Sequence, residues 1–198
     1  MLNIVLSGPP GAGKGTQSEK IVRQYQLIHI ATGELFRKHI SQETRVGAQV
    51  KKYIHQGKLV PDQLVMDMVE EKIKKHSQCK GLLFDGFPRT IAQAEMLDNK
   101  LAEYQTSISG TIMLTVPEEE LKQRIKQRRN ELGRIDDLKV PTRINVYLEA
   151  TLPVAAYYKS QDKLFNIQGV GTIEAIFARI TRAIDRFKTT SQTTYEEL

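Results

Sequence analysis

The residues with the most specific chemistry lie near the N-terminus, in the stretch Gly-Pro-Pro-Gly-Ala-Gly-Lys-Gly-Thr at positions 8–16. A short β-branched run precedes this stretch, and a helical pattern begins at Lys14. Glycines allow successive backbone N–H groups to turn toward an anion, and the N-terminus of a helix adds a positive dipole. Lys14 would add a full charge beside the outer phosphates of a nucleotide. The stretch therefore predicts a polyphosphate-binding loop, with an ordinary glycine-rich turn as the weaker alternative.

This loop departs from the general phosphate-loop pattern at one position. That pattern has Ser or Thr directly after the lysine, as a ligand for Mg²⁺. Here Gly15 stands at that position and Thr16 follows it. Asp85 ends a buried apolar run and could hold Mg²⁺ instead, through water because Gly15 offers no ligand. A buried aspartate without a metal is the alternative interpretation of Asp85.

Arginines form a second group with a shared chemistry. Phosphoryl transfer needs little covalent help and much neutralisation of charge on phosphate oxygens. A planar guanidinium meets two such oxygens at once, so several arginines from different segments are expected at such a site. Taken singly, each arginine could equally be surface charge. The candidates, which the family resemblance given below singles out among the arginines of the chain, are Arg37, Arg89, Arg124, Arg128, Arg134 and Arg143.

Short apolar runs alternate with helical patterns along the chain, and these elements must position the candidate residues. Strands are expected at 2–6, 27–30, 81–84, 111–116 and 164–167. Helices are expected at 14–25, 33–41, 44–55, 61–76, 90–104, from 118 into a basic segment, 141–160 and 173–187. Such alternation implies right-handed βαβ units and a parallel sheet covered on both faces. We predict one α/β domain over 1–188, and a disordered tail at 189–198, which lacks apolar periodicity.

Composition narrows the class of protein. The chain has 198 residues, of which 40% are hydrophobic and 26% charged, as in soluble globular proteins. No apolar run approaches the roughly 18 residues that cross a bilayer. We expect no secretory signal, because the short apolar stretch before the glycine loop has no basic region ahead of it. Cys79 is the only cysteine, which excludes disulfides and multi-cysteine zinc sites and fits the reducing cytoplasm.

The net charge of +6 fits nucleic acid or a small polyanion equally well. Basic residues cluster at 122–134, where a solvated helix face is the usual interpretation. No basic patch interleaved with aromatic residues supports nucleic-acid binding. We therefore expect a monomer whose partners are small nucleotides, with neither nucleic acid nor membrane.

Several motifs make the chain similar to the nucleoside monophosphate kinase family, whose phosphate loop has the same Lys-Gly-Thr variant. The most specific is Asp-Gly-Phe-Pro-Arg at 85–89, and the likeness covers nearly all of residues 2–187. The other matching segments are 31–37, 57–62, Thr90 with Gln93, and 133–137 with Arg143. The resemblance implies a P-loop NTPase fold with a five-stranded parallel sheet, an inserted nucleoside-monophosphate-binding segment at about 31–60, and a short lid at about 127–137.

The resemblance also implies a Mg²⁺-dependent, reversible transfer of the γ-phosphoryl of ATP to AMP, and a role for each matching residue. Catalytic roles fall on Lys14, Arg89, Arg128, Arg134 and Arg143. ATP would contact Gly11, Ala12, Gly13, Lys14, Gly15, Thr16, Arg124, Arg128 and Gly171. AMP would contact Thr32, Gly33, Arg37, Lys58, Leu59, Val60, Gly86, Phe87, Pro88, Arg89, Gln93, Arg134 and Arg143. Mg²⁺ would be held by Asp85, and no zinc is expected.

The acceptor base depends on two positions. Thr32 and Gln93 match the adenylate kinase pattern, whereas kinases of UMP and CMP typically have Ala and Asn there. A glutamine amide can donate to and accept from an adenine edge, and a pyrimidine would leave it partly unmatched, at a cost of about 1–3 kcal/mol. We therefore predict AMP, with UMP or CMP as the alternative.

Two further alternatives come from other classes. A small GTPase would need Asp-x-x-Gly and Asn-Lys-x-Asp, and the chain has only Asn-Lys-Leu-Ala at 99–102. A non-catalytic nucleotide-binding module remains open because the spacing from Arg134 to Arg143 is two residues shorter than is usual in the family. Pro141 also bars a continuous helix before it, so the connection from Arg134 to Arg143 departs from the family pattern.

Overall fold

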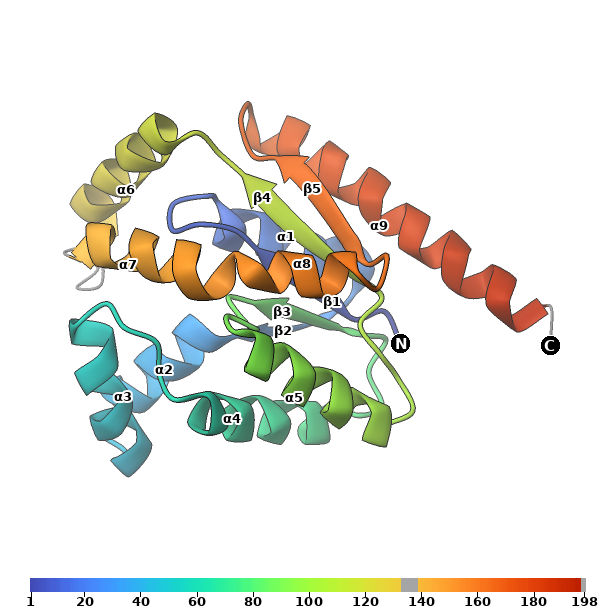
Figure 1. Ribbon diagram of the computed structural model, residues 1–198, viewed down its shortest axis with the longest axis horizontal. Coiled ribbons are helices and arrows are strands. Elements are labelled where there is room, and N and C mark those ends of the chain that lie inside the picture. Colours follow the sequence, from blue (N-terminus) through green and yellow to red (C-terminus); the bar gives the residue numbers. More distant parts are fainter. Residues whose placement is uncertain (133–138, 197–198) are drawn as a thin grey trace.

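A computed structural model describes residues 1–132 and 139–196, and describes side chains for 1–127 and 139–187. Its centre is a parallel sheet in the order β2-β3-β1-β4-β5. The strands are β1 Ile4–Ser7, β2 Ile28–Ala31, β3 Leu82–Asp85, β4 Gly110–Thr115 and β5 Leu164–Gln168 (Figure 1). The predicted α/β class and five-stranded parallel sheet are confirmed.

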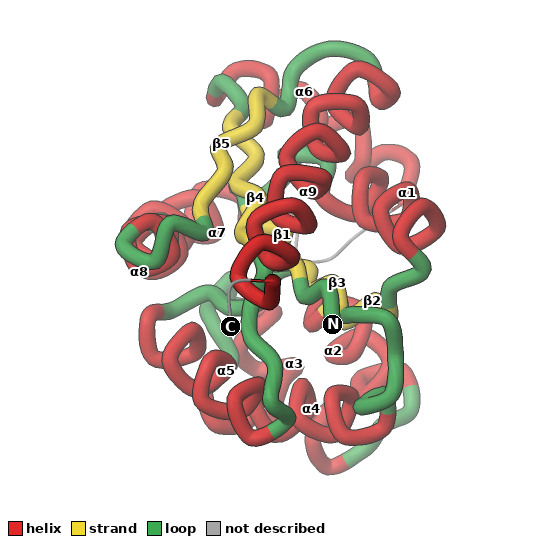
Figure 2. The backbone as a smooth tube through the Cα atoms, turned by 90° about the vertical axis from the view of Figure 1, so that its right-hand side faces the viewer, coloured by secondary structure: helices red, strands yellow, loops and turns green. Residues whose placement is uncertain are grey.

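Helices connect the strands and cover both faces of the sheet (Figure 2). They are α1 Lys14–Tyr25, α2 Thr32–Ser41, α3 Arg45–His55, α4 Asp62–Lys75, α5 Ile91–Glu103, α6 Glu118–Leu132, α7 Val140–Val146, η2 Tyr147–Thr151, α8 Pro153–Lys159 and α9 Ile173–Glu196. No helix in the described parts of the chain is both long and apolar enough to cross a membrane.

The alternation of side chains along each strand builds two cores. In β1, Ile4 and Leu6 point into the layer of α1, α6 and α9, whereas Val5 points into the layer of α4, α5 and α8. All three side chains are fully buried. Successive strand residues face opposite sides of a sheet, so a wholly apolar run is what a strand covered on both faces requires.

The strand order reverses at β1. From β1 the chain first builds β2 and β3 on one side, and then crosses to β4 and β5 on the other. Ligands of open α/β sheets bind outside the carboxyl ends of the strands at such a reversal. The glycine loop begins there, directly after Ser7.

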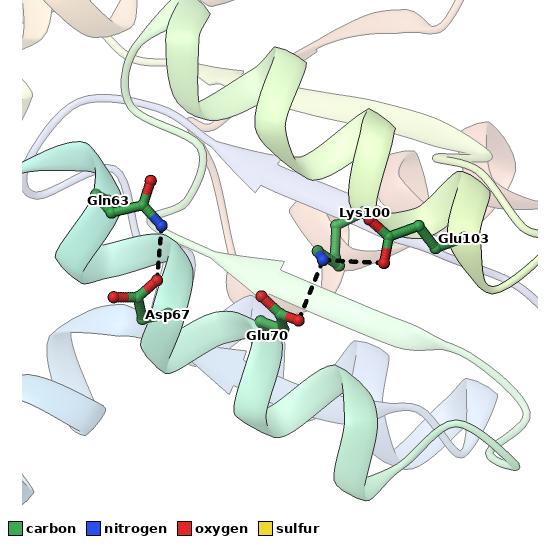
Figure 3. A network of polar contacts seen from close by, with 5 residues as sticks. All are labelled: Gln63, Asp67, Glu70, Lys100 and Glu103. Atoms are coloured by element: carbon green, nitrogen blue, oxygen red, sulfur yellow. Dashed lines mark hydrogen bonds and ion pairs between the residues drawn. The ribbon is translucent and has the colours of Figure 1, made fainter.

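Polar side chains join α4 to α5 on the surface of one layer (Figure 3). Lys100 Nζ lies 3.1 Å from Glu70 Oε1 of α4 and 2.9 Å from Glu103 Oε2 of α5. Exposed ion pairs of this kind contribute little stability, so burial of the apolar helix faces holds this layer on the sheet.

The segment expected as one helix at 141–160 is divided. A π-helical turn, η2, separates α7 from α8, and Leu152 N donates to Tyr147 O at 2.8 Å. Pro153 has no N–H to donate to the carbonyl of Glu149, so the α-helical hydrogen-bond pattern cannot continue through it. The π-helical turn η2 ends just before this proline.

The last helix is longer than expected. Helix α9 continues to Glu196, so residues 189–196 differ from the disordered tail predicted for 189–198. The chain has no glycine or proline after Gly171, so nothing in the backbone ends the helix near Phe187. Residues 197–198 lie outside the described part.

Candidate active site

A cleft of about 840 Å³ opens at the carboxyl ends of the strands. Its walls come from segments that are far apart in sequence: the glycine loop, α2, the stretch before α4, the loop after β3, α6 and α7 with η2. A volume of several hundred Å³ with walls from many segments is typical of sites for small organic ligands.

The glycine loop wraps around the amino group of Lys14. Lys14 Nζ donates to Gly8 O at 2.7 Å and to Pro9 O at 3.0 Å. Gly11 has φ +85°, and a Cβ there would lie 2.8 Å from Ile125 Cγ1 of α6, so the loop requires glycine at this position. The first turn of α1 has no acidic residue to oppose an anion. Charge, helix dipole and backbone N–H groups therefore meet at one end of the cleft.

Asp85 lies beside this loop at the end of β3. Its side chain is 13% exposed, and Oδ2 accepts a hydrogen bond from Ser18 Oγ at 3.0 Å. His29 Nε2 of the adjacent strand lies 3.4 Å from the same oxygen. Burial alone would raise the pKa of Asp85, but the contacts with His29, Lys14 and Ser18 hold this pKa below its usual value. The carboxylate is therefore ionised at neutral pH.

The pKa of His29 is shifted in the opposite direction from that of Asp85. Burial alone would lower the pKa of His29, but its contact with Asp85, together with the charges of Glu34 and Glu19, raises this pKa above its usual value. A protonated His29 and an ionised Asp85 stabilise each other at the junction of β2 and β3.

The residues around Asp85 fit a magnesium ion that arrives with a nucleotide. Mg²⁺ keeps several waters and binds through one or two carboxylates together with substrate phosphates. Asp85 supplies an ionised carboxylate beside the phosphate loop. Among the described side chains, those of residues 1–127 and 139–187, no group of three or more His, Cys, Asp or Glu could hold a metal ion.

Gly86 organises a second part of the cleft wall, next to Asp85 in the chain. Its carbonyl accepts from Thr32 Oγ1 at 2.9 Å and from Arg89 Nε at 2.6 Å. Gly86 has φ +69°, and a Cβ there would lie 2.9 Å from Arg89 Nη2. Gln93 lies further along this wall, 2% exposed, and its Oε1 accepts from Arg89 N at 2.7 Å. Thr32, Arg89 and Gln93 therefore form one connected polar wall.

Two arginines approach the cleft from the other side. Arg124 of α6 forms an ion pair with Glu120 at 2.8 Å, and its Nη1 lies 3.9 Å from the position of a Cβ on Gly13. Arg143 lines the cleft from α7. Both guanidinium groups can meet an anion held by the loop or by the opposite wall.

The structure brings together most of the residues predicted for the site. Those that line the cleft are Gly11, Ala12, Gly13, Lys14, Gly15, Thr16, Thr32, Gly33, Arg37, Lys58, Leu59, Val60, Asp85, Gly86, Pro88, Arg89, Gln93, Arg124, Arg143 and Gly171. Phe87 does not line it: its ring is 1% exposed and packs in the core against Phe84. Arg134 lies outside the described residues, and so does the side chain of Arg128.

Several residues of the site were not found from the sequence. Ser18 and His29 hold Asp85, and Tyr147 and Gln127 line the cleft from η2 and α6. Ser18 lies one helical turn after Lys14, which places both on the same side of α1 and is a signal that spacing could have supplied. Tyr147 follows Arg143 at the same spacing.

A phosphate loop at the strand-order reversal, an ionised aspartate beside it and converging arginines define a P-loop nucleotide-binding protein. The cleft extends well past the loop to a second polar wall, as expected of a phosphotransferase that holds a donor and an acceptor.

Comparison with known proteins gives the family. The family model described as adenylate kinase matches residues 6–163. The chain is 46% identical over 188 residues to an adenylate kinase of Phocaeicola vulgatus, covering 94% of this chain and 100% of the relative. It is 45% identical over 188 residues to one of Bacteroides thetaiotaomicron, with the same coverage, and 42% identical over 193 residues to one of Porphyromonas gingivalis, covering 96% and 100%.

The chain belongs to the adenylate kinase family. It is a nucleoside monophosphate kinase that transfers a phosphoryl group between ATP and AMP, as the motifs predicted. Members of this family generally use ATP together with Mg²⁺.

Proposed function

We propose that the two substrates of the adenylate kinase reaction bind in different parts of this cleft. The glycine loop with Lys14 binds the phosphates of ATP, and the wall of Thr32, Arg89 and Gln93 binds AMP. The observation that carries this proposal is that Lys14 of the phosphate loop and Gln93 of α5 line one and the same cleft. A donor and an acceptor bound end to end in such a cleft would have their phosphates between these two residues, and Asp85 and Arg89 line the same cleft.

On the ATP side, backbone N–H groups of 11–16 and the Lys14 ammonium neutralise the β- and γ-phosphates. Binding ATP requires Lys14 Nζ to exchange the carbonyls of Gly8 and Pro9 for phosphate oxygens. Arg124, beside Gly13, contacts the same nucleotide. Gly171 closes this end of the cleft.

On the AMP side, Arg37 and Arg89 bind the acceptor phosphate in bidentate fashion. Thr32 and Gln93 contact the adenine, with the backbone of 58–60 around it. Phe87 acts through the core, since its ring anchors the loop that carries Gly86 and Pro88. Each of these residues other than Phe87 lines the cleft.

Transfer itself depends on charge neutralisation. Arg89 and Arg143 line the cleft, and their guanidinium groups would stabilise the charge that spreads over the oxygens of the transferring phosphoryl group. The family resemblance assigns the same role to Arg128 and Arg134. Asp85 would hold Mg²⁺ through water, and the ion would supply further neutralisation between the phosphates. Closure of the short lid at 127–137 excludes water, so that AMP rather than water accepts the phosphoryl group.

The proposal includes a single domain at 1–188 with an AMP-binding insert at 31–60, acting as a monomer in the cytoplasm. A lone cysteine, Cys79, fits a reducing compartment.

Paired arginine truncations at the two ends test this division. Arg37→Ala should raise the KM for AMP by about tenfold or more and leave the KM for ATP unchanged. Arg124→Ala should raise the KM for ATP alone. ADP formation is measured with AMP, CMP, UMP and GMP offered separately to each variant. Equal effects of either variant on both nucleotides would contradict the proposed division of the cleft.

A further inference from the structure

A closed hydrogen-bond network joins Gln93 to Asp62 and Thr90, two residues that do not line the cleft. Gln93 Nε2 donates to Asp62 Oδ1 at 2.7 Å, and Thr90 Oγ1 donates to Asp62 Oδ2 at 3.1 Å. Thr90 Oγ1 in turn accepts from Gln93 N at 3.1 Å. The other end of the amide, Oε1, accepts from Arg89 N at 2.7 Å. Each carboxylate oxygen of Asp62 therefore has one donor, and each end of the Gln93 amide has one partner.

This network leaves the amide of Gln93 only one favourable orientation. A carboxylate can only accept hydrogen bonds, and a backbone N–H can only donate. Rotation of the amide by half a turn would place Oε1 against Asp62 and Nε2 against Arg89 N, which are two mismatches at a site that is 2% exposed. Buried polar groups without partners are costly, so the mismatch at Asp62 and the mismatch at Arg89 N each disfavour the rotated form.

The orientation decides what the amide offers to a base. A glutamine amide has two N–H donors and two acceptor lone pairs, and the network uses one of each. One donor and one acceptor remain, on fixed sides. Adenine presents a donor at its 6-amino group and an acceptor at N1, whereas a 6-oxopurine presents an acceptor at O6 and a donor at N1. The donor and the acceptor are exchanged between the two purine edges. An amide that cannot rotate can therefore pair with only one of these edges.

We propose that Asp62 is a positioning residue for base selection: it holds the Gln93 amide in the orientation that matches adenine and thereby excludes 6-oxopurine monophosphates. The inference rests on the proposed AMP site at Gln93. Asp62 is the first residue of α4, where a carboxylate also interacts favourably with the helix dipole. That role requires no contact with Gln93 or Thr90, so it does not explain the network.

Asp62→Asn tests the proposal. The asparagine amide can either accept from Gln93 Nε2 or donate to Gln93 Oε1, so one of the two mismatches of the rotated form disappears. IMP is the probe, because it differs from AMP only at positions 1 and 6 of the purine. We expect the ratio of kcat/KM for AMP to kcat/KM for IMP to fall by about tenfold, with the KM for ATP unchanged.

Asp67→Asn is the matched control (Figure 3). Asp67 lies on the same helix and accepts from a glutamine Nε2 at the same distance, 2.7 Å from Gln63, but at the surface. A loss of charge or stability in α4 would lower kcat/KM for AMP and for IMP together in both variants. The proposal requires instead that the ratio of these two kcat/KM values changes in Asp62→Asn alone. If Asp62→Asn does not fold, Asp62→Ser carries the same expectation, since its hydroxyl can also donate or accept.

The variant Gln93→Leu distinguishes the proposed AMP site at Gln93 from the proposed positioning role of Asp62. If Gln93→Leu raises the KM for AMP and Asp62→Asn leaves the AMP-to-IMP ratio unchanged, the AMP site stands and the positioning role of Asp62 is overturned. If Gln93→Leu has no effect on AMP, both proposals fail. A lower ratio in Asp62→Asn, with Asp67→Asn equal to the wild type, supports the positioning role.

Discussion

Ser18 donates a hydrogen bond to Asp85 at 3.0 Å and so ties the helix that begins at the phosphate loop to the end of the neighbouring strand. The contact joins residues 67 positions apart. In the proposed function this contact lies between the loop that would bind the donor phosphates and the carboxylate that would hold Mg²⁺, where small misplacements are costly for transfer.

We expect Ser18→Ala to lower the free energy of unfolding by about 1 kcal/mol, since a largely buried carboxylate loses one of its partners. The concentration of Mg²⁺ needed for half-maximal rate should rise, because Asp85 is less well positioned. Urea unfolding and Mg²⁺ titration of the initial rate measure the two effects. Ser41→Ala is the control, since its exposed hydroxyl donates only to Lys38 O. Equal losses in both variants would contradict a special role for Ser18.

The pair of His29 and Asp85 predicts a pH dependence of stability. Because the folded-state pKa of His29 is raised above 6.5, its stabilisation is fully present below pH 6.5 and is lost as pH rises through the folded value. Because the pKa of Asp85 is lowered below 3.8, its stabilisation is present above that pH and is lost as pH falls through the folded value. Asp85→Asn should lower the pKa of His29, as read from NMR titration of its ring. An unchanged titration would show that another group raises it.

Arg143→Ala should lower kcat by about a thousandfold and change the affinity for ATP far less, because its guanidinium acts on charge that develops during transfer. Single-turnover rates and equilibrium binding of ATP separate the two effects. Arg182→Ala, on the exposed face of α9, is the control and should behave as wild type. Near-normal turnover of Arg143→Ala would remove this arginine from the mechanism.

Gly86→Ala should impair AMP more than ATP. The backbone there has φ +69°, and the new methyl group would lie 2.9 Å from Arg89 Nη2. Strain of this kind costs on the order of 1–3 kcal/mol, and the Arg89 side chain can relieve it only by leaving its contact with the Gly86 carbonyl. KM values for both nucleotides, together with thermal unfolding, measure the outcome. A variant with an unchanged KM for AMP would show that Arg89 does not need this contact.

The predicted elements agree closely with the observed ones where a single local pattern dominates. The helix expected at 14–25 and the strand expected at 164–167 differ from α1 and β5 by at most one residue. The predictions were poorest where two signals compete. Pro153 divides the helix expected at 141–160, and α9 passes through a polar stretch with no apolar period.

The sequence by itself determined the phosphate loop and the parallel sheet, because each depends on residue types at short, fixed spacings. Glycine spacing sets the turn, and the apolar run of β1 requires cover on both faces. Only the tertiary structure decided which side chains hold those residues in place. Ser18, His29 and Asp62 are remote in sequence from the groups that they contact, and their contacts depend on how α1, β2 and α4 pack against the rest of the fold. Packing of distant elements leaves no local period, so the contacts of His29 and Asp62 could not be predicted from spacing, and the spacing of Ser18 from Lys14 indicates only that both lie on one side of α1.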